Sequence, residues 1–275
     1  MKNLTKRICS AAVLILILVY LILDTTATPI RVVVATLISL IIVWEYSRLF
    51  KSQFYQVLFQ ILLISLVFSA PYFTGLLETI SNYFFGFLVL TWLVILFRVL
   101  TYKKKNINDF LIFIIGYLTL LPFVGALFTI IIYPGILLYA VITVSIADSA
   151  AYFVGRRVGK TPLLPNISPG KTIEGFIGSL IITPIISSLI VYFFYGEIVI
   201  GFLLVGFFVT LISVVGDLFF SLLKRNKNIK DSSNLIPGHG GFIDLLDGTI
   251  AVLPLLAFLS FKVSYLSMVL FVMSF

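Results

Sequence analysis

The sequence predicts an all-α polytopic membrane protein with about nine membrane-spanning helices, and three observations lead to this fold class. Of its 275 residues, 61% are hydrophobic and 11% are charged, whereas soluble domains carry about 25% charged residues. The mean hydropathy is +1.19. Apolar runs close to the ~20 residues that a spanning helix needs follow one another along the chain, and no stretch between them could bury a soluble core. We therefore expect one membrane domain.

Nine apolar runs are the predicted helices. They cover residues 8–23, 30–44, 54–70, 83–100, 110–132, 135–155, 175–195, 198–223 and 249–273. Asp148, Asp217 and Lys262 interrupt three of the later runs, and an ionisable residue inside a membrane is costly unless it faces protein, water or a cation. The run 30–44 is short and contains Arg31 near its start, so a re-entrant segment is the alternative to a spanning helix there.

Positive charges decide the predicted topology. With nine spans and the N-terminus inside, every lysine and arginine except Arg31 and Lys262 falls at a cytoplasmic end, as the positive-inside tendency requires. Removing any one span would invert every later loop and scatter these charges. We therefore expect a protein of the cytoplasmic (inner) membrane, with loops 156–174 and 224–248 in the cytoplasm and the C-terminus outside. The run 8–23 also resembles a secretory signal peptide, but the later runs favour a retained first helix.

The chain divides by polarity into two regions. Residues 1–133 contain apolar segments with almost no ionisable residues, so we expect them to be mostly structural. Residues 134–275 hold most of the acids and half of the bases, which places the chemistry there. The bases lie in short loops and not along one soluble face, so anionic lipid and anionic substrate are the expected partners and nucleic acid is not. Cys9 is the single cysteine, which excludes a disulfide framework or a cysteine metal site within one chain.

Carboxylates form the first candidate site. Asp244 and Asp247 stand three residues apart, which on a helix leaves about 5 to 6 Å between their Cβ atoms and suits a shared divalent cation. Capping of the helix start is the alternative role. Asp217 and Asp148 lie near the inner ends of their own predicted helices. Four carboxylates on one membrane face favour Mg²⁺, with Mn²⁺ as the alternative, because these hard cations take oxygen ligands.

Two glycine-containing segments could contact phosphate. Residues 237–241, with the sequence PGHGG, would let backbone amides approach an anion, although the spacing is not that of a P-loop. His239 within it could contact phosphate or donate a proton, and a structural role is the alternative. In residues 168–172, with the sequence SPGKT, Lys171 and the amides of the following helix could hold a phosphate. The alternative is a simple Pro-Gly turn before that helix.

The stretch from Ser221 to Asp247 resembles the signature of the phosphatidate cytidylyltransferases, also called CDP-diacylglycerol synthases. That signature consists of Ser, two residues, Lys-Arg, four residues, Lys-Asp, then Pro-x-His-Gly-Gly and a closing Asp-Arg-x-Asp. The match covers 27 positions with one departure, Leu245, where the family has arginine. The segments around Asp148 and SPGKT also resemble polar segments of the family.

The resemblance implies an integral membrane nucleotidyltransferase that converts CTP and phosphatidic acid to CDP-diacylglycerol and pyrophosphate in phospholipid biosynthesis, with a homodimer as one assembly the chain could adopt. It implies metal binding by Asp217, Asp244 and Asp247, with Asp148 as a further ligand, and catalytic roles for Lys224 and His239. The implied substrate-binding residues are Ser168, Lys171, Thr172, Lys224, Arg225, Lys230, Asp231, His239, Gly240 and Gly241. A membrane transporter or ion channel is the alternative function, but it would place its polar groups near the middle of the membrane and not at helix ends.

Overall fold

The computed structural model describes residues 20, 28–69, 81–102, 107–130, 134–195, 200–238 and 240–262. This part of the chain is helical apart from one short antiparallel hairpin, which confirms the predicted all-α class. The helices are α2 (Thr28–Ser47), α3 (Gln53–Ser69), α5 (Ser81–Leu100), α6 (Asp109–Ile130), α7 (Pro134–Val158), α8 (Ile173–Tyr195), α9 (Ile200–Asn226) and α10 (Phe242–Lys262). The hairpin joins β1 (Pro162–Leu164) to β2 (Ser168–Thr172), within a segment that was predicted only as a loop.

Six described helices, α2 and α6 to α10, are long and apolar enough to cross a membrane, so the protein is a membrane protein. The apolar helix α3 and the described apolar part of α5, Gly86–Leu100, are shorter. The predicted run 8–23 and the end of the run 249–273 lie outside the described residues. The predicted count of nine spans is therefore not confirmed. The short run 30–44 belongs to α2, whose 20 continuous helical residues are enough to span.

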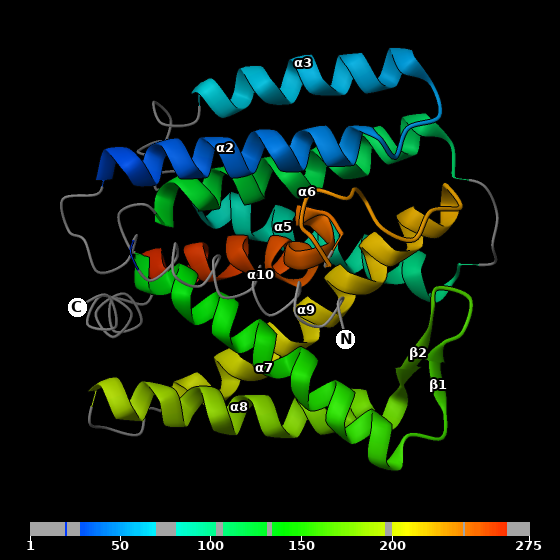
Figure 1. The fold of residues 1–275 in the computed structure, drawn as a ribbon. Helices are drawn as coiled ribbons and strands as arrows, with labels where there is room; N and C mark the ends of the chain where they lie inside the picture. Colours follow the sequence, from blue (N-terminus) through cyan, green and yellow to red (C-terminus); the bar gives the residue numbers. More distant parts are fainter. Residues whose placement is uncertain are drawn as a thin grey trace.

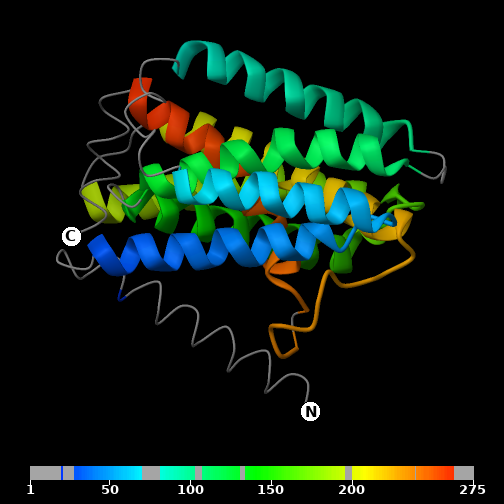
Figure 2. The same ribbon diagram turned by 90° about the horizontal axis from the view of Figure 1, so that it is seen from above.

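Helix α10 is central to the bundle and packs against α2, α5, α6, α7 and α9 (Figure 1). Its buried face includes Ile250, Leu253 and Leu256. Helices α2 and α3 lie on one side of it and α7 and α8 on the other (Figure 1). Helix α5 lies at the edge of the bundle, as the view from above shows (Figure 2). The first turn of α10 is therefore surrounded by other elements of the chain.

Hydrogen bonds from the C-terminal end of α9 hold neighbouring segments in place. The Asn226 side chain bonds both backbone groups of Ile107, accepting from its N–H at 2.8 Å and donating to its carbonyl oxygen at 3.3 Å. The Lys227 ammonium donates to the carbonyl oxygens of Arg48 and Phe50, which follow α2. Carbonyl groups at the end of a helix lack hydrogen-bond donors within the helix, and the Lys227 ammonium acts as a donor for the carbonyl groups that follow α2. The start of α6 and the end of α2 are thus fixed to the end of α9.

Candidate active site

A close crossing of α9 and α10 positions two of the predicted aspartates. At Gly216 a β-carbon would lie 2.7 Å from the Ala251 Cβ and 2.8 Å from the Asp247 carbonyl oxygen. Any larger residue would push the two backbones apart, which is why small residues are favoured at such helix contacts. Asp217 directly follows Gly216, so it lies beside the turn of α10 that carries Asp247. The two carboxylates interact electrostatically with each other and with Asp148 of α7.

Lys171 from β2 places a positive charge among these aspartates. Its ammonium forms an ion pair with Asp217 Oδ2, and the Ser221 hydroxyl donates to Asp217 Oδ1 at 3.2 Å. Burial alone lowers the pKa of Lys171, but the negative charges of Asp217, Asp148 and Asp247 outweigh it and raise the pKa above its ordinary value. The ammonium therefore stays charged at neutral pH. The structure thus brings Lys171 of the hairpin next to Asp217 of α9, while its predicted contact with phosphate stays a prediction.

Strand pairing and a helix cap hold the segment that carries Lys171. Strand β2 pairs with β1 through Thr172 with Pro162 and through Ser168 with Leu164. The Thr172 hydroxyl accepts the Gly175 N–H at 3.1 Å and caps the first turn of α8. Residues 168–172 are therefore a strand followed by a capped helix, which differs from a simple Pro-Gly turn. The predicted substrate contacts of Ser168 and Thr172 stay predictions.

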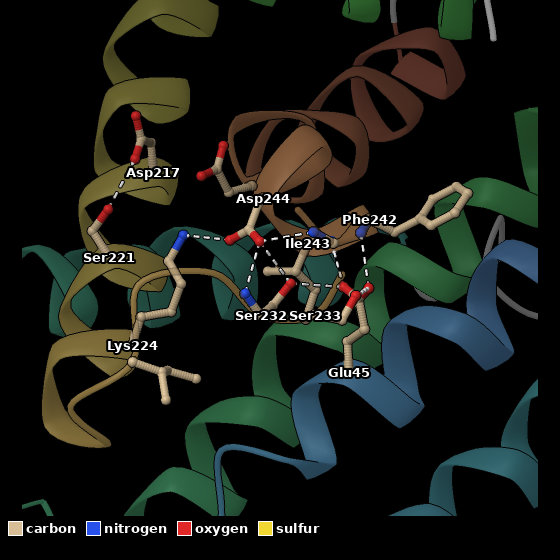
Figure 3. A network of polar contacts seen from close by, with 12 residues as sticks. Glu45, Asp217, Ser221, Lys224, Ser232, Ser233, Phe242, Ile243 and Asp244 are labelled. Carbon is tan, nitrogen blue, oxygen red and sulfur yellow. Dashed lines mark hydrogen bonds and ion pairs between the residues drawn. The ribbon is translucent and has the colours of Figure 1, made fainter. Parts of the chain in front are cut away.

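Asp244 has a separate set of partners in the first turn of α10 (Figure 3). Its Oδ1 accepts the Lys224 ammonium at 2.6 Å, and both side chains are nearly buried, with 8% and 10% of their surface exposed. Its Oδ2 accepts the N–H groups of Ser232 at 2.7 Å and Gly241 at 2.9 Å, and lies 3.0 Å from the Ser232 hydroxyl oxygen. Asp244 thus connects α9, the 231–241 loop and α10.

The carboxylates fit a divalent cation unequally. In the ranges that the structure describes, no group of three or more His, Cys, Asp or Glu side chains is arranged to hold a metal ion. Asp244 is occupied by Lys224 and three further donor groups. By contrast, the Asp247 carboxylate accepts only the Gly248 N–H from a described residue, and it lies with Asp148 near Asp217. Asp217 is also engaged, by the Lys171 ammonium and the Ser221 hydroxyl. Metal binding by Asp217, Asp244, Asp247 and Asp148 stays a prediction, and Asp244 is the member of this set with the most competing partners.

The other predicted phosphate-binding residues lie around this centre. The Arg225 guanidinium donates to the backbone carbonyl oxygens of Ile167 and Ile229 and so ties the turn between β1 and β2 to the segment that follows α9. Lys230 and Asp231 are exposed. Gly240 forms an isolated β-bridge with Ile236, and His239 lies outside the described residues. The substrate roles of these residues stay predictions.

Glu45 was not among the predicted site residues. It belongs to α2 and is fully buried. Its Oε1 accepts the Ser233 hydroxyl at 2.6 Å and the Phe242 N–H at 2.9 Å. Its Oε2 accepts the Ser232 hydroxyl at 2.9 Å and the Ile243 N–H at 2.7 Å (Figure 3). Glu45 therefore caps α10 from a distant helix, because the first N–H groups of a helix have no partner within it.

Gly241 makes room for this carboxylate. A β-carbon on Gly241 would lie 2.0 Å from the Ser232 hydroxyl oxygen and 2.5 and 2.6 Å from the two Glu45 carboxylate oxygens. A glycine is required here by a close approach within the protein itself. The one signal in the sequence was an acidic residue at the end of an apolar run. Nothing local links Glu45 to partners that lie 187 to 198 residues further along the chain.

An apolar cavity of about 870 Å³ lies between α5 and the pair α9 and α10. Trp92 of α5, Val215 of α9 and Pro254 of α10 line it. Leu218 and Leu163 line it as well, and these residues adjoin the ion-paired centre: Leu218 follows Asp217, and Leu163 belongs to the strand that pairs with the strand of Lys171. The cavity therefore has a hydrophobic wall, and part of that wall is built by α9 and the hairpin, the elements that carry Asp217 and Lys171.

Comparison with known proteins agrees with these features. Residues 5–262 match the model of the cytidylyltransferase family. The chain is 37% identical over 190 residues to the phosphatidate cytidylyltransferase of Haemophilus influenzae, covering 62% of this chain and 66% of that protein. It is 40% identical over 124 residues to that of Bacillus subtilis and 44% identical over 121 residues to that of Staphylococcus haemolyticus. The matches cover 44% of this chain in both cases, and 45% and 46% of those proteins. The matched stretches thus span about half to two thirds of the length of these relatives. The family match covers nearly the whole chain. The chain therefore belongs to the cytidylyltransferase family.

Proposed function

We propose that the protein is a phosphatidate cytidylyltransferase, which makes CDP-diacylglycerol and pyrophosphate from CTP and phosphatidic acid. The observation that carries this proposal is the placement of the ion-paired centre of Lys171 and Asp217 beside a hydrophobic cavity. A lipid phosphate needs both surroundings at once, because its head is anionic and its tails are apolar. The names of the three relatives support the same reaction.

The reaction joins two anions. An oxygen of the lipid phosphate bonds to the α-phosphorus of CTP, the bond from that phosphorus to the bridging oxygen breaks, and pyrophosphate leaves. A phosphomonoester has a second pKa near 6, so the lipid phosphate is largely a dianion at neutral pH and needs no strong general base. The protein's task is to hold the phosphates together and to stabilise charge on the leaving group. Lys171 and Lys224 supply positive charge for this task.

Asp217 and Asp247, together with Asp148, would hold Mg²⁺ or Mn²⁺. When bound, such a cation neutralises charge on the phosphates and on the leaving pyrophosphate. Two observations support this assignment. The three carboxylates interact electrostatically with one another. Among the described residues, the Asp247 carboxylate accepts only one hydrogen bond, from the Gly248 N–H. The lysine Lys171 then compensates the charge of Asp217 before the metal and nucleotide arrive.

The acyl chains of phosphatidic acid would lie in the cavity lined by Trp92, Val215 and Pro254. Its volume falls in the range of about 300 to 1,000 Å³ that is typical of ligand sites. Leu218 and Leu163, which also line it, adjoin Asp217 and the strand of Lys171. A lipid in this position would have its phosphate near Lys171. Its tails would run between α5 and α9.

The site would face the cytoplasm, in an inner membrane, with the N-terminus inside and the C-terminus outside. Basic residues support this orientation: Arg48 and Lys51 follow α2, Arg156 and Arg157 end α7, and the four bases from Lys224 to Lys230 lie at the end of α9. The positive-inside tendency places these ends in the cytoplasm. Cytosolic CTP would then reach the site directly.

A direct assay tests the function. The purified protein in detergent, supplied with radiolabelled CTP, phosphatidic acid and Mg²⁺, should produce a labelled lipid and release pyrophosphate in equal amounts. Diacylglycerol in place of phosphatidic acid should give no labelled lipid, because it lacks the attacking phosphate. Absence of labelled lipid with phosphatidic acid, from protein that remains monodisperse, would overturn the proposal.

A further inference from the structure

Glu45 is a buried charged group for which the reaction above has no use. Its side chain is fully buried within α2, and no cationic side chain of the described residues forms an ion pair with it. Burying a carboxylate is costly unless hydrogen bonds compensate it. Here four hydrogen bonds do so, from two serine hydroxyls and two backbone N–H groups. All four donors belong to the 231–241 loop and the first turn of α10.

Ser232 links Glu45 to the site. Its hydroxyl oxygen lies 2.9 Å from Glu45 Oε2 and 3.0 Å from Asp244 Oδ2 (Figure 3). A hydroxyl has one hydrogen, so it can donate to only one of the two carboxylates at a time. Ser233 provides a contrast, since its hydroxyl donates to Glu45 at 2.6 Å and forms no hydrogen bond to Asp244. The two neighbouring serines therefore differ in whether they reach Asp244.

Glu45 also fixes the backbone that carries Asp244. It accepts the N–H groups of Phe242 and Ile243, the two residues that precede Asp244. Asp247 lies one turn further along the same helix. A shift of this first turn would move Asp244 relative to Lys224, with which it is paired at 2.6 Å. Active-site geometry tolerates such shifts poorly, because displacements near 1 Å can cost about a hundredfold in rate.

We propose that Glu45 is a positioning residue, which holds the 231–241 loop and the first turn of α10 so that Asp244 and Asp247 face their partners, and which acts on Asp244 through Ser232. This inference rests on the proposed function for its kinetic part. It makes α2, within the region predicted to be mostly structural, part of the active-site machinery. Glu45 itself contacts no substrate in this role.

The kinetic test compares four variants with the wild type. Glu45→Gln keeps the shape of the side chain, but its amide nitrogen cannot accept hydrogen bonds, so part of the donor set loses its acceptor. We expect kcat to fall by about tenfold or more with a much smaller change in the KM for CTP. Ser232→Ala should lower kcat similarly, and the double variant Glu45→Gln with Ser232→Ala should be no worse than Glu45→Gln alone. Ser233→Ala is the matched comparison, because it removes one hydrogen bond to Glu45 but no contact with Asp244, and it should lower kcat clearly less than Ser232→Ala.

Hydrogen exchange provides a readout that does not depend on catalysis. The N–H groups of Ser232 and Gly241 both donate to Asp244 Oδ2, so their exchange reports on the geometry of this carboxylate. Glu45→Gln should accelerate exchange at both amides, and Ser233→Ala should accelerate it clearly less. If the wild type transfers no CMP, the proposed function fails, while faster exchange in Glu45→Gln still supports the positioning role. Unchanged exchange in Glu45→Gln overturns that role. The role is also overturned if Ser232→Ala and Ser233→Ala lose kcat equally and both losses accompany a lower melting temperature, because that result indicates a general loss of stability.

Discussion

Lys171 and Asp217 lie 46 residues apart in the sequence and form an ion pair between β2 and α9. The pair joins the hairpin to the helix whose crossing with α10 positions Asp247. It is partly exposed, with 26% of the Lys171 side chain and 23% of the Asp217 side chain accessible. An ion-paired lysine of this kind can exchange its carboxylate partner for a phosphate without entering a fully desolvated state.

Replacement of the aspartates tests the assignment of the site. We expect Asp217→Asn, Asp244→Asn and Asp247→Asn each to remove most of the CMP transfer activity, and activity to require added Mg²⁺ or Mn²⁺. The loss is expected because amides carry no charge to balance a cation or the lysines. Initial rates with and without EDTA provide the measurement. Asp109→Asn is the control, since Asp109 accepts the Ser52 N–H away from the site and an amide oxygen can do the same. Metal-independent turnover, or normal rates in all three site variants, would contradict the assignment.

Filling the hydrophobic cavity should discriminate between lipid substrates. Val215→Trp places a large ring in the cavity wall, so we expect kcat/KM to fall for long-chain phosphatidic acid and to change little for a dihexanoyl substrate. Each buried methylene group contributes about 0.8 kcal/mol of binding free energy. Displacing two methylene groups of the acyl chain from the cavity therefore lowers kcat/KM by roughly tenfold. Val33→Trp on α2 is the matched control, because Val33 is 56% exposed and lies outside the cavity. Equal losses for both chain lengths would show that the acyl chains lie elsewhere.

Leu245 stands where the family signature has arginine, between Asp244 and Asp247. It is 38% exposed, so an arginine can be accommodated without entering the buried network. We expect Leu245→Arg to raise activity, since a charge-assisted hydrogen bond to phosphate contributes about 1.5 to 3 kcal/mol, or roughly ten- to a hundredfold. Arg225 already donates through Nε and Nη1 to two backbone carbonyl oxygens, which restricts how its guanidinium could turn toward a phosphate. Rates at saturating Mg²⁺ are compared with those of Leu245→Gln, and an unchanged or lower rate for Leu245→Arg would refute the prediction.

Cysteine labelling can establish the orientation. After replacement of Cys9, Asn166→Cys in the hairpin turn and Ile200→Cys at the start of α9 introduce exposed thiols toward opposite ends of the bundle. We expect a membrane-impermeant maleimide to label position 166 only from the cytoplasmic face and position 200 only from the outer face. Labelling of position 166 from outside alone would contradict a site that is open to cytosolic CTP.

The apolar runs predicted the helices well, because hydrophobic length is a property of each segment alone. The run 175–195 corresponds to α8 at Ile173–Tyr195, and the run 198–223 to α9 at Ile200–Asn226. The predicted run 249–273 left out Asp244 and Asp247, whereas α10 begins at Phe242 and carries both. The spacing of the two aspartates was compatible with a shared helix. It did not predict their different partners, because residues three apart on a helix are rotated by about 60° from each other. Asp244 therefore meets Lys224 and the loop, while Asp247 lies toward Asp217.

The tertiary contacts of the site could not be predicted in the same way. The pairing of Lys171 with Asp217 depends on the register of a hairpin that lacks a strong strand pattern. The role of Glu45 depends on how α2 packs beside α10, which no local pattern determines. In both cases the residue type was visible in the sequence, and its partner came from the assembled bundle.

The distance in sequence between Glu45 and its donors has a consequence for biogenesis. The chain is synthesised from its N-terminus, and α2 enters the membrane long before the segment that contains Ser232, Phe242 and Ile243, which lies 187 to 198 residues later. Until that segment arrives, the Glu45 carboxylate lacks all four of its hydrogen-bond donors, and the first turn of α10 has no acceptor until it reaches α2. The hydrogen bonds around Asp244 are therefore completed late in the maturation of the protein, and truncated chains that end before α10 would retain an uncompensated carboxylate at the C-terminal end of α2.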